Sequence, residues 1–248
     1  MRRATLLALA LTSLGCATTA RAPQSAPQAA VPAAAALPDA LHWTRNSAEH
    51  RAVFLQTYTL ATRRLEELAG GLAPGTWAVS LDGDETVIDN SLFEKEQLAK
   101  GATKFDAQAW TAWVERKEAM PLPGAVAFLK RVHELSGKIA IVTNRSQAEC
   151  PPTEENFRRH AIPYDVILCR PPDNGEKEPR YRAVEQGTAA PGLPPLEIVL
   201  WVGDNIQDFP NLDQSLRLQP DEAYKEFGTR YFILPNPMYG SWERNPPN

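Results

Sequence analysis

The chain has 248 residues, of which 43% are hydrophobic, and its formal net charge is −4 at pH 7. This length and composition suit one domain with an accessory piece, or two small domains, around a sizeable core. The net negative charge leaves no basic footprint, so we expect no nucleic acid polymer as a partner. The four histidines are scattered without metal-ligand spacing and are interpreted as ordinary surface or helix residues.

Residues 1–16 have the pattern of a targeting segment. Two arginines precede an apolar stretch over residues 4–14, which is too short to span a membrane as a stable helix. The stretch ends in Leu-Gly-Cys at Cys16 and resembles a bacterial lipoprotein cleavage site, with Ser13 where Leu is usual. We predict a lipoprotein-type signal peptide over 1–16, lipid attachment at Cys16, and a location in the bacterial cell envelope, at the outer membrane or in the periplasm. The alternative is plain secretion, in which Cys16 is discarded or idle.

Residues 17–39 consist mainly of Ala, Pro, Thr and Gln and contain almost no large apolar side chains. Such a composition cannot bury enough surface to fold, so we predict a disordered tether. A Pro-rich tether stays extended at about 3.1 Å per residue, enough to hold a domain several tens of Å from a membrane. Residues 40–248 would then form the folded part.

The folded part begins with a helical pattern over 46–69, in which Asn46 and Glu49 make a capping-box-like start. Short apolar strands then alternate with helical segments. Strands are expected at 77–81, 138–145, 165–169, 198–202 and 229–234, and helices at 91–120, 121–137, 153–160 and 180–186. This alternation predicts a parallel sheet covered on both faces, with ligands at the carboxyl ends of its strands.

The first strand ends in three acids, Asp82, Asp84 and Glu85. Clustered carboxylates repel one another and are costly to desolvate, so an apolar strand does not usually end this way without a reason. A bound cation would relieve the conflict, because hard divalent metals prefer oxygen ligands. The alternative is an ordinary solvated acidic turn.

Further polar residues follow in chain order near later strand ends: Thr143 and Asn144, then Lys177, then Asp204 and Asp208. Lys177 lies in a charged loop that also carries Arg180 and Arg182. Any one cluster can arise by chance. All of them, in order, favour a single site at one edge of the sheet.

The string Asp82-Gly-Asp-Glu-Thr86 resembles the first motif of the haloacid dehalogenase superfamily, although Gly83 stands where a large apolar residue is usual. Extended to Ser91, it is similar to one branch, the bacterial class C nonspecific acid phosphatases, which include the lipoprotein e 5′-nucleotidases. Segments 203–209 and 232–243 look like the same branch, so the resemblance covers about residues 43–243. It implies an α/β fold with a Rossmann-like parallel sheet, the haloacid dehalogenase-like core. A small helical cap domain would come from the N-terminal helix and about residues 91–120.

The same resemblance implies a role for each polar cluster. Asp82 is the expected nucleophile that forms an aspartyl-phosphate, and Asp84 the expected general acid and then general base. Phosphate oxygens would be bound by Thr143, Asn144 and Lys177, with Arg180 and Arg182 as alternative phosphate contacts. Mg²⁺ would be held by carboxylates and a main-chain oxygen of Asp84, the whole ligand set being Asp82, Asp84, Asp204 and Asp208.

These roles predict a Mg²⁺-dependent acid phosphatase that hydrolyses phosphomonoesters, with nucleoside 5′-monophosphates among its substrates. The expected partners are that phosphomonoester or nucleotide substrate and, through the lipid anchor, a membrane; a homodimer stays open. One alternative is a phosphotransferase, in which an alcohol replaces water in the second step. The other is a non-catalytic surface-binding lipoprotein, which the intact acidic residues disfavour.

Aromatic residues are candidates for binding a nucleobase, because bases stack on aromatic rings for about 1–3 kcal/mol each. Phe93, Trp110 and Trp113 lie in the expected cap, and Tyr239 lies in a Pro- and Gly-rich segment after the last strand. The alternative for the two tryptophans is that they anchor the cap to the core.

Cys150 and Cys169 are the cysteines left if Cys16 is lipidated. They fall near the ends of two strands that are expected to be neighbours, and a secreted location permits oxidation. We hypothesise a disulfide between them, while a pair of free thiols stays open because the sequence cannot give their separation.

Overall fold

The computed structural model describes residues 36–247. The predicted signal peptide with Cys16, and the predicted tether as far as residue 35, lie outside the described residues. Within 36–247, no helix combines the length and the apolar composition that crossing a membrane would require.

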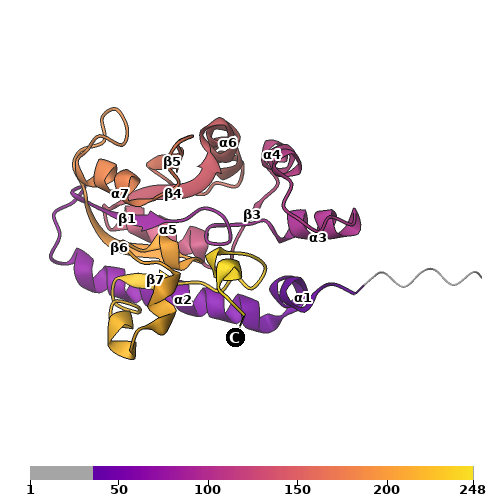
Figure 1. The fold of residues 1–248 in the computed structure, drawn as a ribbon. Coiled ribbons are helices and arrows are strands. Elements are labelled where there is room, and N and C mark those ends of the chain that lie inside the picture. Colours follow the sequence, from indigo (N-terminus) through magenta and orange to yellow (C-terminus); the bar gives the residue numbers. More distant parts are fainter. Residues whose placement is uncertain (1–35, 248) are drawn as a thin grey trace, which may run out of the picture. The chain divides into compact units, whose positions relative to one another are not determined.

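A parallel sheet with the strand order β5-β4-β1-β6-β7 forms the centre of the fold (Figure 1). Because β1 lies in the middle, the loops that follow β1, β4 and β6 meet at one edge of the sheet. This arrangement confirms the predicted α/β fold with a parallel sheet. The strands are β1 (Trp77–Leu81), β4 (Lys138–Ser146), β5 (Val166–Arg170), β6 (Glu197–Gly203) and β7 (Tyr231–Ile233).

Helices cover both faces of this sheet. One face packs against α2 (Ala48–Ala69), α5 (Ala125–Glu134) and α6 (Cys150–Arg159), and the other against α7 (Glu178–Glu185). Side chains alternate between the two layers along each strand, as the pleat of a strand requires. Short 3-10 helices complete the described chain: Gln147–Glu149, Ile206–Asp208, Gln214–Leu218, Asp221–Tyr224 and Ser241–Arg244.

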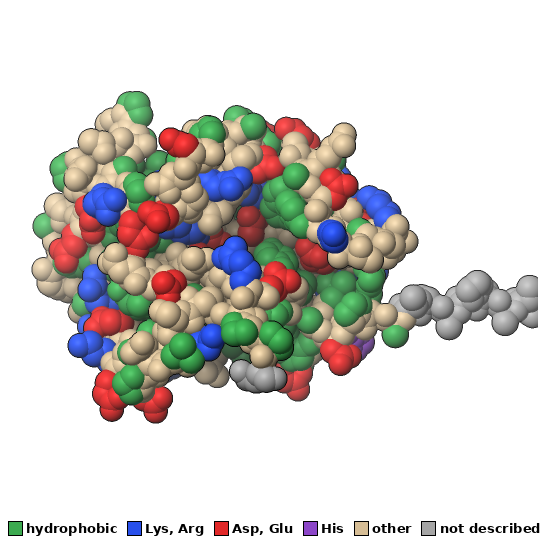
Figure 2. All heavy atoms as spheres, in the orientation of Figure 1, with side chains coloured by type: hydrophobic (Ala, Val, Ile, Leu, Met, Phe, Trp, Pro, Cys, Tyr) green, Lys and Arg blue, Asp and Glu red, His purple; other side chains and the backbone are tan. Residues whose placement is uncertain are grey.

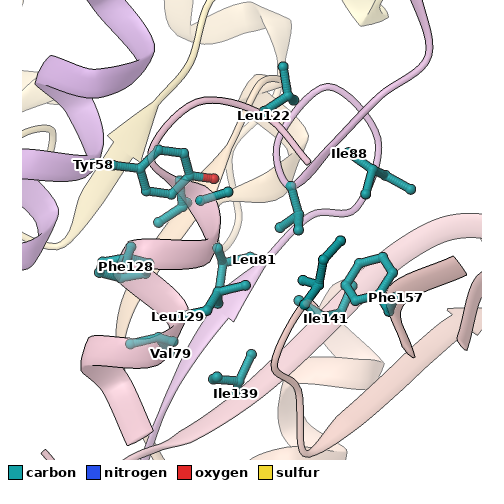
Figure 3. Packing of buried hydrophobic residues seen from close by; sticks show 14 of the residues in the cluster. Tyr58, Val79, Leu81, Ile88, Leu122, Phe128, Leu129, Ile139, Ile141 and Phe157 are labelled. Carbon is teal, nitrogen blue, oxygen red and sulfur yellow. The ribbon is translucent and has the colours of Figure 1, made fainter. Parts of the chain in front are cut away.

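The larger core lies between the sheet and α5. Figure 3 shows Leu81 of β1 and Ile141 of β4 close to Leu129 of α5, and all three side chains are almost completely buried. Burial of a side chain of this size contributes about 1.5–3 kcal/mol. The packing therefore fixes the strand ends from which the polar residues project.

The first long helix begins two residues later than its sequence pattern indicates. Ser47 is its N-cap, with an extended backbone, and the Ser47 hydroxyl accepts a hydrogen bond from the backbone N–H of His50 at 3.0 Å. The predicted capping start at Asn46 is therefore wrong, because Asn46 is the last residue of a separate helix, α1 (Asp39–Asn46). Ser47, the next residue, caps the backbone N–H groups at the start of α2 as well as an asparagine would.

In the sequence, a small helical insertion lies between β1 and the next strand of the sheet, β4. It contains α3 (Ser91–Ala99) and α4 (Ala107–Arg116), and it is closed by the antiparallel pair β2 (Ile88–Asp89) and β3 (Met120–Pro121). Figure 1 shows α3 and α4 beside one end of the sheet, where α3 packs on α1. The insertion therefore packs on α1, whereas α2, which was expected to belong to the cap, runs along the face of the sheet.

A disulfide links Cys150, the first residue of α6, to Cys169 in β5, with their Cα atoms 5.9 Å apart. The hypothesis of a bridge between these two residues is confirmed. The bridge ties the start of α6, which follows the end of β4, to the neighbouring strand.

Candidate active site

A tight turn follows β1 and carries the first acidic cluster. The backbone N–H groups of Val87 and Ile88 both donate to the carbonyl oxygen of Gly83, at 2.9 and 3.0 Å. Within the turn, Glu85 has a φ of 51°, and its carboxylate accepts hydrogen bonds from the backbone and side-chain N–H groups of Asn90 at 2.8 and 3.2 Å. Burial raises the pKa of Glu85 well above its usual value. The turn is thereby tied to the start of α3.

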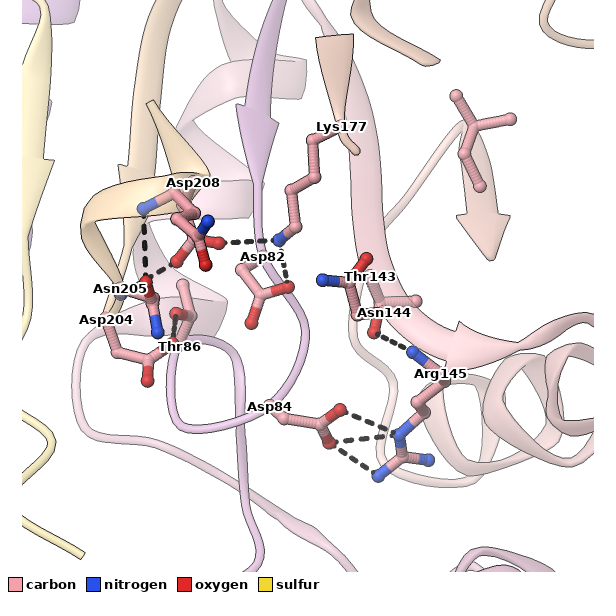
Figure 4. A network of polar contacts seen from close by, with 12 residues as sticks. Asp82, Asp84, Thr86, Thr143, Asn144, Arg145, Lys177, Asp204, Asn205 and Asp208 are labelled. Atoms are coloured by element: carbon pink, nitrogen blue, oxygen red, sulfur yellow. Dashed lines mark hydrogen bonds and ion pairs between the residues drawn. The ribbon is translucent and has the colours of Figure 1, made fainter. Parts of the chain in front are cut away.

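Lys177 lies between two carboxylates at the edge of the sheet (Figure 4). Its Nζ is 2.5 Å from Oδ1 of Asp82 and 2.7 Å from Oδ1 of Asp208, and all three residues are buried. Burial raises the pKa of Asp82 to about 7, and the charge of Lys177 opposes that rise. Burial alone would lower the pKa of Lys177, but the charges of Asp208 and Asp82 outweigh it and raise the pKa. The lysine is therefore held as a cation.

A third carboxylate completes this cluster. Oxygens of Asp82, Asp204 and Asp208 all lie within 4.8 Å of one another. Asp204 accepts hydrogen bonds from the Thr86 hydroxyl at 3.1 Å and the Asn236 amide at 2.9 Å. Burial, and then the charges of Asp208 and Asp82, raise the pKa of Asp204 well above its usual value. A single lysine leaves these three carboxylates with excess negative charge, so the donor set fits a hard divalent cation.

Gly203 makes room for Asp208 at the end of β6. Asp208 closes the 3-10 helix Ile206–Asp208, and its Oδ2 accepts a hydrogen bond from the backbone N–H of Asn205 at 2.8 Å. A Cβ atom at residue 203 would lie only 2.3 Å from the Cβ of Asp208. The glycine directly before Asp204 is the sequence feature that permits this close approach.

Asp84 lies apart from the three carboxylates and pairs with Arg145 (Figure 4). The Nε and Nη2 groups of Arg145 donate to Oδ1 of Asp84 at 3.0 and 2.8 Å, and the Arg145 side chain is only 2% exposed. The side-chain amide of Asn90 donates to the same oxygen at 2.8 Å. Sequence reasoning missed Arg145, although an arginine directly after Thr143 and Asn144, at the end of an apolar strand, was a usable signal.

The predicted phosphate ligands of β4 lie beside the turn that follows β1. Thr143 is fully buried, and a Cβ atom at Gly83 would be 3.3 Å from its hydroxyl oxygen. Asn144 is exposed, and its side-chain oxygen accepts a hydrogen bond from Nη2 of Arg180 at 2.7 Å. Arg180 also donates to the carbonyl oxygen of Thr143 at 2.5 Å, so it braces the β4 loop. Arg182, the other alternative phosphate contact, is exposed on α7.

Figure 2 shows acidic side chains recessed in a hollow near the middle of the drawn face, with hydrophobic side chains beside them. Of the four predicted base-stacking residues, Phe93 and Trp113 are buried, at 3% and 2% exposure. The indole N–H of Trp113 donates to the Asn90 side chain at 2.8 Å. Trp113 therefore fits the alternative role, in which it anchors the inserted helices to the core. Trp110 and Tyr239 are half-buried, and the Tyr239 hydroxyl has no hydrogen-bond partner among the described residues. These two rings keep accessible surface.

Comparison with known proteins places these features in context. Residues 3–242 match the family model described as HAD superfamily, subfamily IIIB (Acid phosphatase). The chain is also similar to the solved structure of the class C acid phosphatase from Bacillus anthracis, with 30% sequence identity, a TM-score of 0.72, and coverage of 82% of this chain and 85% of that chain. The crystal structure of the Bacillus anthracis enzyme with tungstate bound matches at 30% identity and a TM-score of 0.71, with the same coverage of both chains.

Proposed function

Because the chain belongs to the acid phosphatases of HAD subfamily IIIB and is a phosphomonoesterase, we propose that it is a Mg²⁺-dependent enzyme whose substrates include nucleoside 5′-monophosphates. Catalysis proceeds through an aspartyl-phosphate on Asp82. The observation that carries this proposal is the place of Asp82 at the carboxyl end of β1, with Nζ of Lys177 2.5 Å from its Oδ1. Family membership favours this catalyst over a non-catalytic lipoprotein.

Mg²⁺ would be held by the carboxylates of Asp82, Asp204 and Asp208 and by the main-chain oxygen of Asp84. Support comes from the mutual approach of the three carboxylates within 4.8 Å and from their burial with one lysine. When bound, the ion supplies positive charge that offsets the charge of the phosphate and these carboxylates. Asp204 is prepared for this role because Thr86 and Asn236 hold its carboxylate in place.

In the first step, a carboxylate oxygen of Asp82 attacks the phosphorus atom of the substrate. The bond between phosphorus and the leaving oxygen breaks, and a proton on Asp84 passes to that oxygen, which departs as an alcohol. Lys177 stabilises the negative charge on the phosphoryl oxygens as the bonds exchange. The product of this step is the aspartyl-phosphate.

In the second step, water attacks the same phosphorus atom and gives a proton to Asp84, which now acts as the general base. The bond between phosphorus and the Asp82 oxygen breaks, and inorganic phosphate leaves. Both carboxyl groups return to their starting states. One residue can serve both steps because the leaving oxygen and the attacking water occupy the same side of the phosphorus in turn.

The phosphate group is held by the Thr143 hydroxyl, the Asn144 backbone and Lys177. Thr143 lies beside Gly83 in the turn that follows β1, and Nη1 of Arg180 donates a hydrogen bond to the Thr143 carbonyl oxygen. The Bacillus anthracis relative has been crystallised with tungstate, which is a tetrahedral oxyanion like phosphate. That observation on a 30% identical protein supports an oxyanion site in this fold.

Nucleotide preference requires a surface for the base. The cluster of Asp82, Lys177, Asp204 and Asp208, called the phosphate cluster below, recognises only phosphate and metal. Tyr239 is the best single candidate, and Trp110 of α4 is the second, since both rings are half-buried. Phe93 packs edge-on against Trp110 with ring centroids 5.2 Å apart and thereby supports it. Stacking tolerates any base, so purine and pyrimidine monophosphates should both be substrates.

We also propose that the protein is lipid-anchored through Cys16 in the cell envelope, as its first residues predict. The intact mass of the mature protein tests this directly. A mass that includes an acylated cysteine at residue 16 supports the anchor, and a chain that begins at an unmodified residue downstream contradicts it.

The catalytic proposal is tested by hydrolysis of p-nitrophenyl phosphate, AMP and UMP after EDTA treatment and after Mg²⁺ is added back. We expect activity on all three substrates that is lost with EDTA and restored by Mg²⁺. Asp82→Asn should abolish this activity. Asp173→Asn, the same change at an exposed position in the loop between β5 and α7, should not. Full activity in EDTA, or in folded Asp82→Asn protein, would contradict the proposal.

A further inference from the structure

Arg145 is a buried cation that the phosphate cluster does not use. Its Nη1 donates to the Thr153 hydroxyl at 3.0 Å, and its Nη2 donates to the Asn90 side-chain oxygen at 3.2 Å as well as to Asp84. Its guanidinium carbon lies 5.3 Å from the ring centroid of Trp110. Every nitrogen of the side chain is thus engaged within the protein, which suits an anchor better than a phosphate ligand.

The anchoring of Asp84 is unequal at its two oxygens. Oδ1 accepts from Nε and Nη2 of Arg145 and from the Asn90 amide, at 3.0, 2.8 and 2.8 Å. Oδ2 accepts only from Nε, at 3.2 Å, among the described residues. One oxygen of the carboxyl is saturated with donors, and the other is left available for a proton.

The cap maintains this arrangement. Trp113 of α4 donates to Oδ1 of Asn90 at 2.8 Å, so the Asn90 amide must present its N–H₂ group to Asp84. Trp110 of the same helix lies against the guanidinium group of Arg145. The two tryptophans of α4 therefore support the residues that hold Asp84.

We propose that Arg145 is a positioning residue that fixes Asp84 with Oδ2 as the oxygen that carries the transferred proton. This inference rests on the proposed role of Asp84 as the proton donor to the leaving oxygen. The proton moves from Oδ2 to that oxygen as its bond to phosphorus breaks, and water returns a proton to Oδ2 in the second step. Misplacing Oδ2 weakens both transfers without removing the carboxyl group.

A positioning role has a consequence that a structural role lacks. An alkyl phosphate releases a strongly basic alkoxide and depends on the proton, whereas p-nitrophenyl phosphate releases a stable phenolate and depends on it little. General acid catalysis contributes about 10²–10⁴-fold. Loss of the Arg145 fork should therefore reduce kcat/KM about 10²-fold for glycerol 2-phosphate and less than about 10-fold for p-nitrophenyl phosphate.

The experiment compares kcat/KM on these two substrates for Arg145→Lys, Asp84→Asn and Arg116→Lys. Lysine keeps the charge of Arg145 but cannot form the fork of hydrogen bonds. Arg116 is a matched control in the cap, because it lies over the Trp113 ring at 4.7 Å and pairs with Glu96, yet has no hydrogen bond or ion pair with Asp84. Thr153→Val removes only one anchor of Arg145 and should show the same selectivity to a smaller degree, should Arg145→Lys fail to fold.

We expect Arg145→Lys and Asp84→Asn to lose alkyl phosphatase activity selectively, and Arg116→Lys to match the wild type on both substrates. Equal losses on both substrates in folded Arg145→Lys and Thr153→Val, alongside a selective loss in Asp84→Asn, would overturn the role of Arg145 alone. A non-selective loss in Asp84→Asn would overturn the acid role of Asp84 itself, and the inference with it.

Discussion

The ammonium group of Lys177 lies 2.5 Å from the Asp82 carboxylate, in a site where both side chains are buried. The two residues are 95 positions apart in the chain, and the parallel sheet brings them together. The contact places a fixed positive charge at the residue that we assign as the nucleophile. The contact also makes the stability of the metal-free protein depend on one lysine.

Lys177→Met should destabilise the metal-free protein strongly, because it leaves Asp82 and Asp208 buried without their cation. Removing one partner of a buried ion pair costs about 3–5 kcal/mol. Urea unfolding in EDTA measures this loss, and added Mg²⁺ should recover part of it. Lys138→Met is the control, because the Lys138–Asp165 pair is more exposed and should cost less than about 1 kcal/mol. Equal effects of the two substitutions would contradict the expectation.

Gly203→Ala should weaken Mg²⁺ binding and activity together, because the new Cβ would meet the Asp208 Cβ at 2.3 Å and displace that carboxylate. A loss of about 10–100-fold in metal affinity is typical when the support of a metal ligand is disturbed. Isothermal titration with Mg²⁺ gives the affinity. Gly70→Ala, where a Cβ meets nothing within 4 Å, should leave affinity unchanged. Normal Mg²⁺ binding in Gly203→Ala would remove Asp208 from the ligand set.

The pH dependence of stability should include a contribution from Asp165, at the opposite end of the sheet from the site. Burial would raise its pKa, but hydrogen bonds from His133, Lys138 and the Ile139 N–H outweigh burial and lower it. A lowered pKa stabilises the fold above the unfolded value of about 3.9, and that stability is lost as the pH falls through the folded value.

Asp165→Asn should therefore lower the free energy of unfolding by about 1–2 kcal/mol at pH 7, and the difference from wild type should shrink near pH 3. Urea unfolding of both proteins at the two pH values measures this. A difference that is constant with pH would show that the carboxylate charge does not matter.

Tyr239→Ala should raise KM for AMP several-fold and leave p-nitrophenyl phosphate hydrolysis nearly unchanged, because only the nucleotide has a base to stack. Tyr239→Phe is the matched control. The Tyr239 hydroxyl has no partner among the described residues, so removing it should change neither substrate. Equal losses on both substrates in Tyr239→Ala would assign the ring to the fold or the phosphate site instead.

Much of the site could be predicted because Asp82 and Asp204 each come directly after an apolar strand. Asp82 and Asp204 were located in this way, and the parallel sheet then placed them side by side. Lys177 has no such pattern, since it precedes a helix in a charged loop, and only its order relative to the other motifs identified it.

The remaining contacts depend on tertiary packing. Arg145 reads locally as a polar residue at a strand end, and nothing nearby in sequence shows that Asp84, 61 residues away, is its partner. The spacing of Trp110 and Trp113 fits a base-binding face and a packing face equally well. Only the hydrogen bond from Trp113 to Asn90 shows that Trp113 has a packing role. The start of α2 was misplaced because Asn46 and Ser47 are both good caps, and the choice depended on where α1 ends.

The central claim is that Asp82 carries the phosphoryl group during turnover. The most direct measurement is intact-mass spectrometry of enzyme mixed with excess AMP and quenched in acid within the first turnovers, followed by peptide mapping of the adduct. We predict a phosphoryl adduct on the peptide that contains Asp82, and no adduct in Asp82→Asn. In Asp84→Asn mixed with p-nitrophenyl phosphate, whose leaving group needs little proton donation, the adduct should increase because its hydrolysis lacks the general base. A fully active enzyme that never shows the adduct, or an adduct on a different residue, would contradict the account.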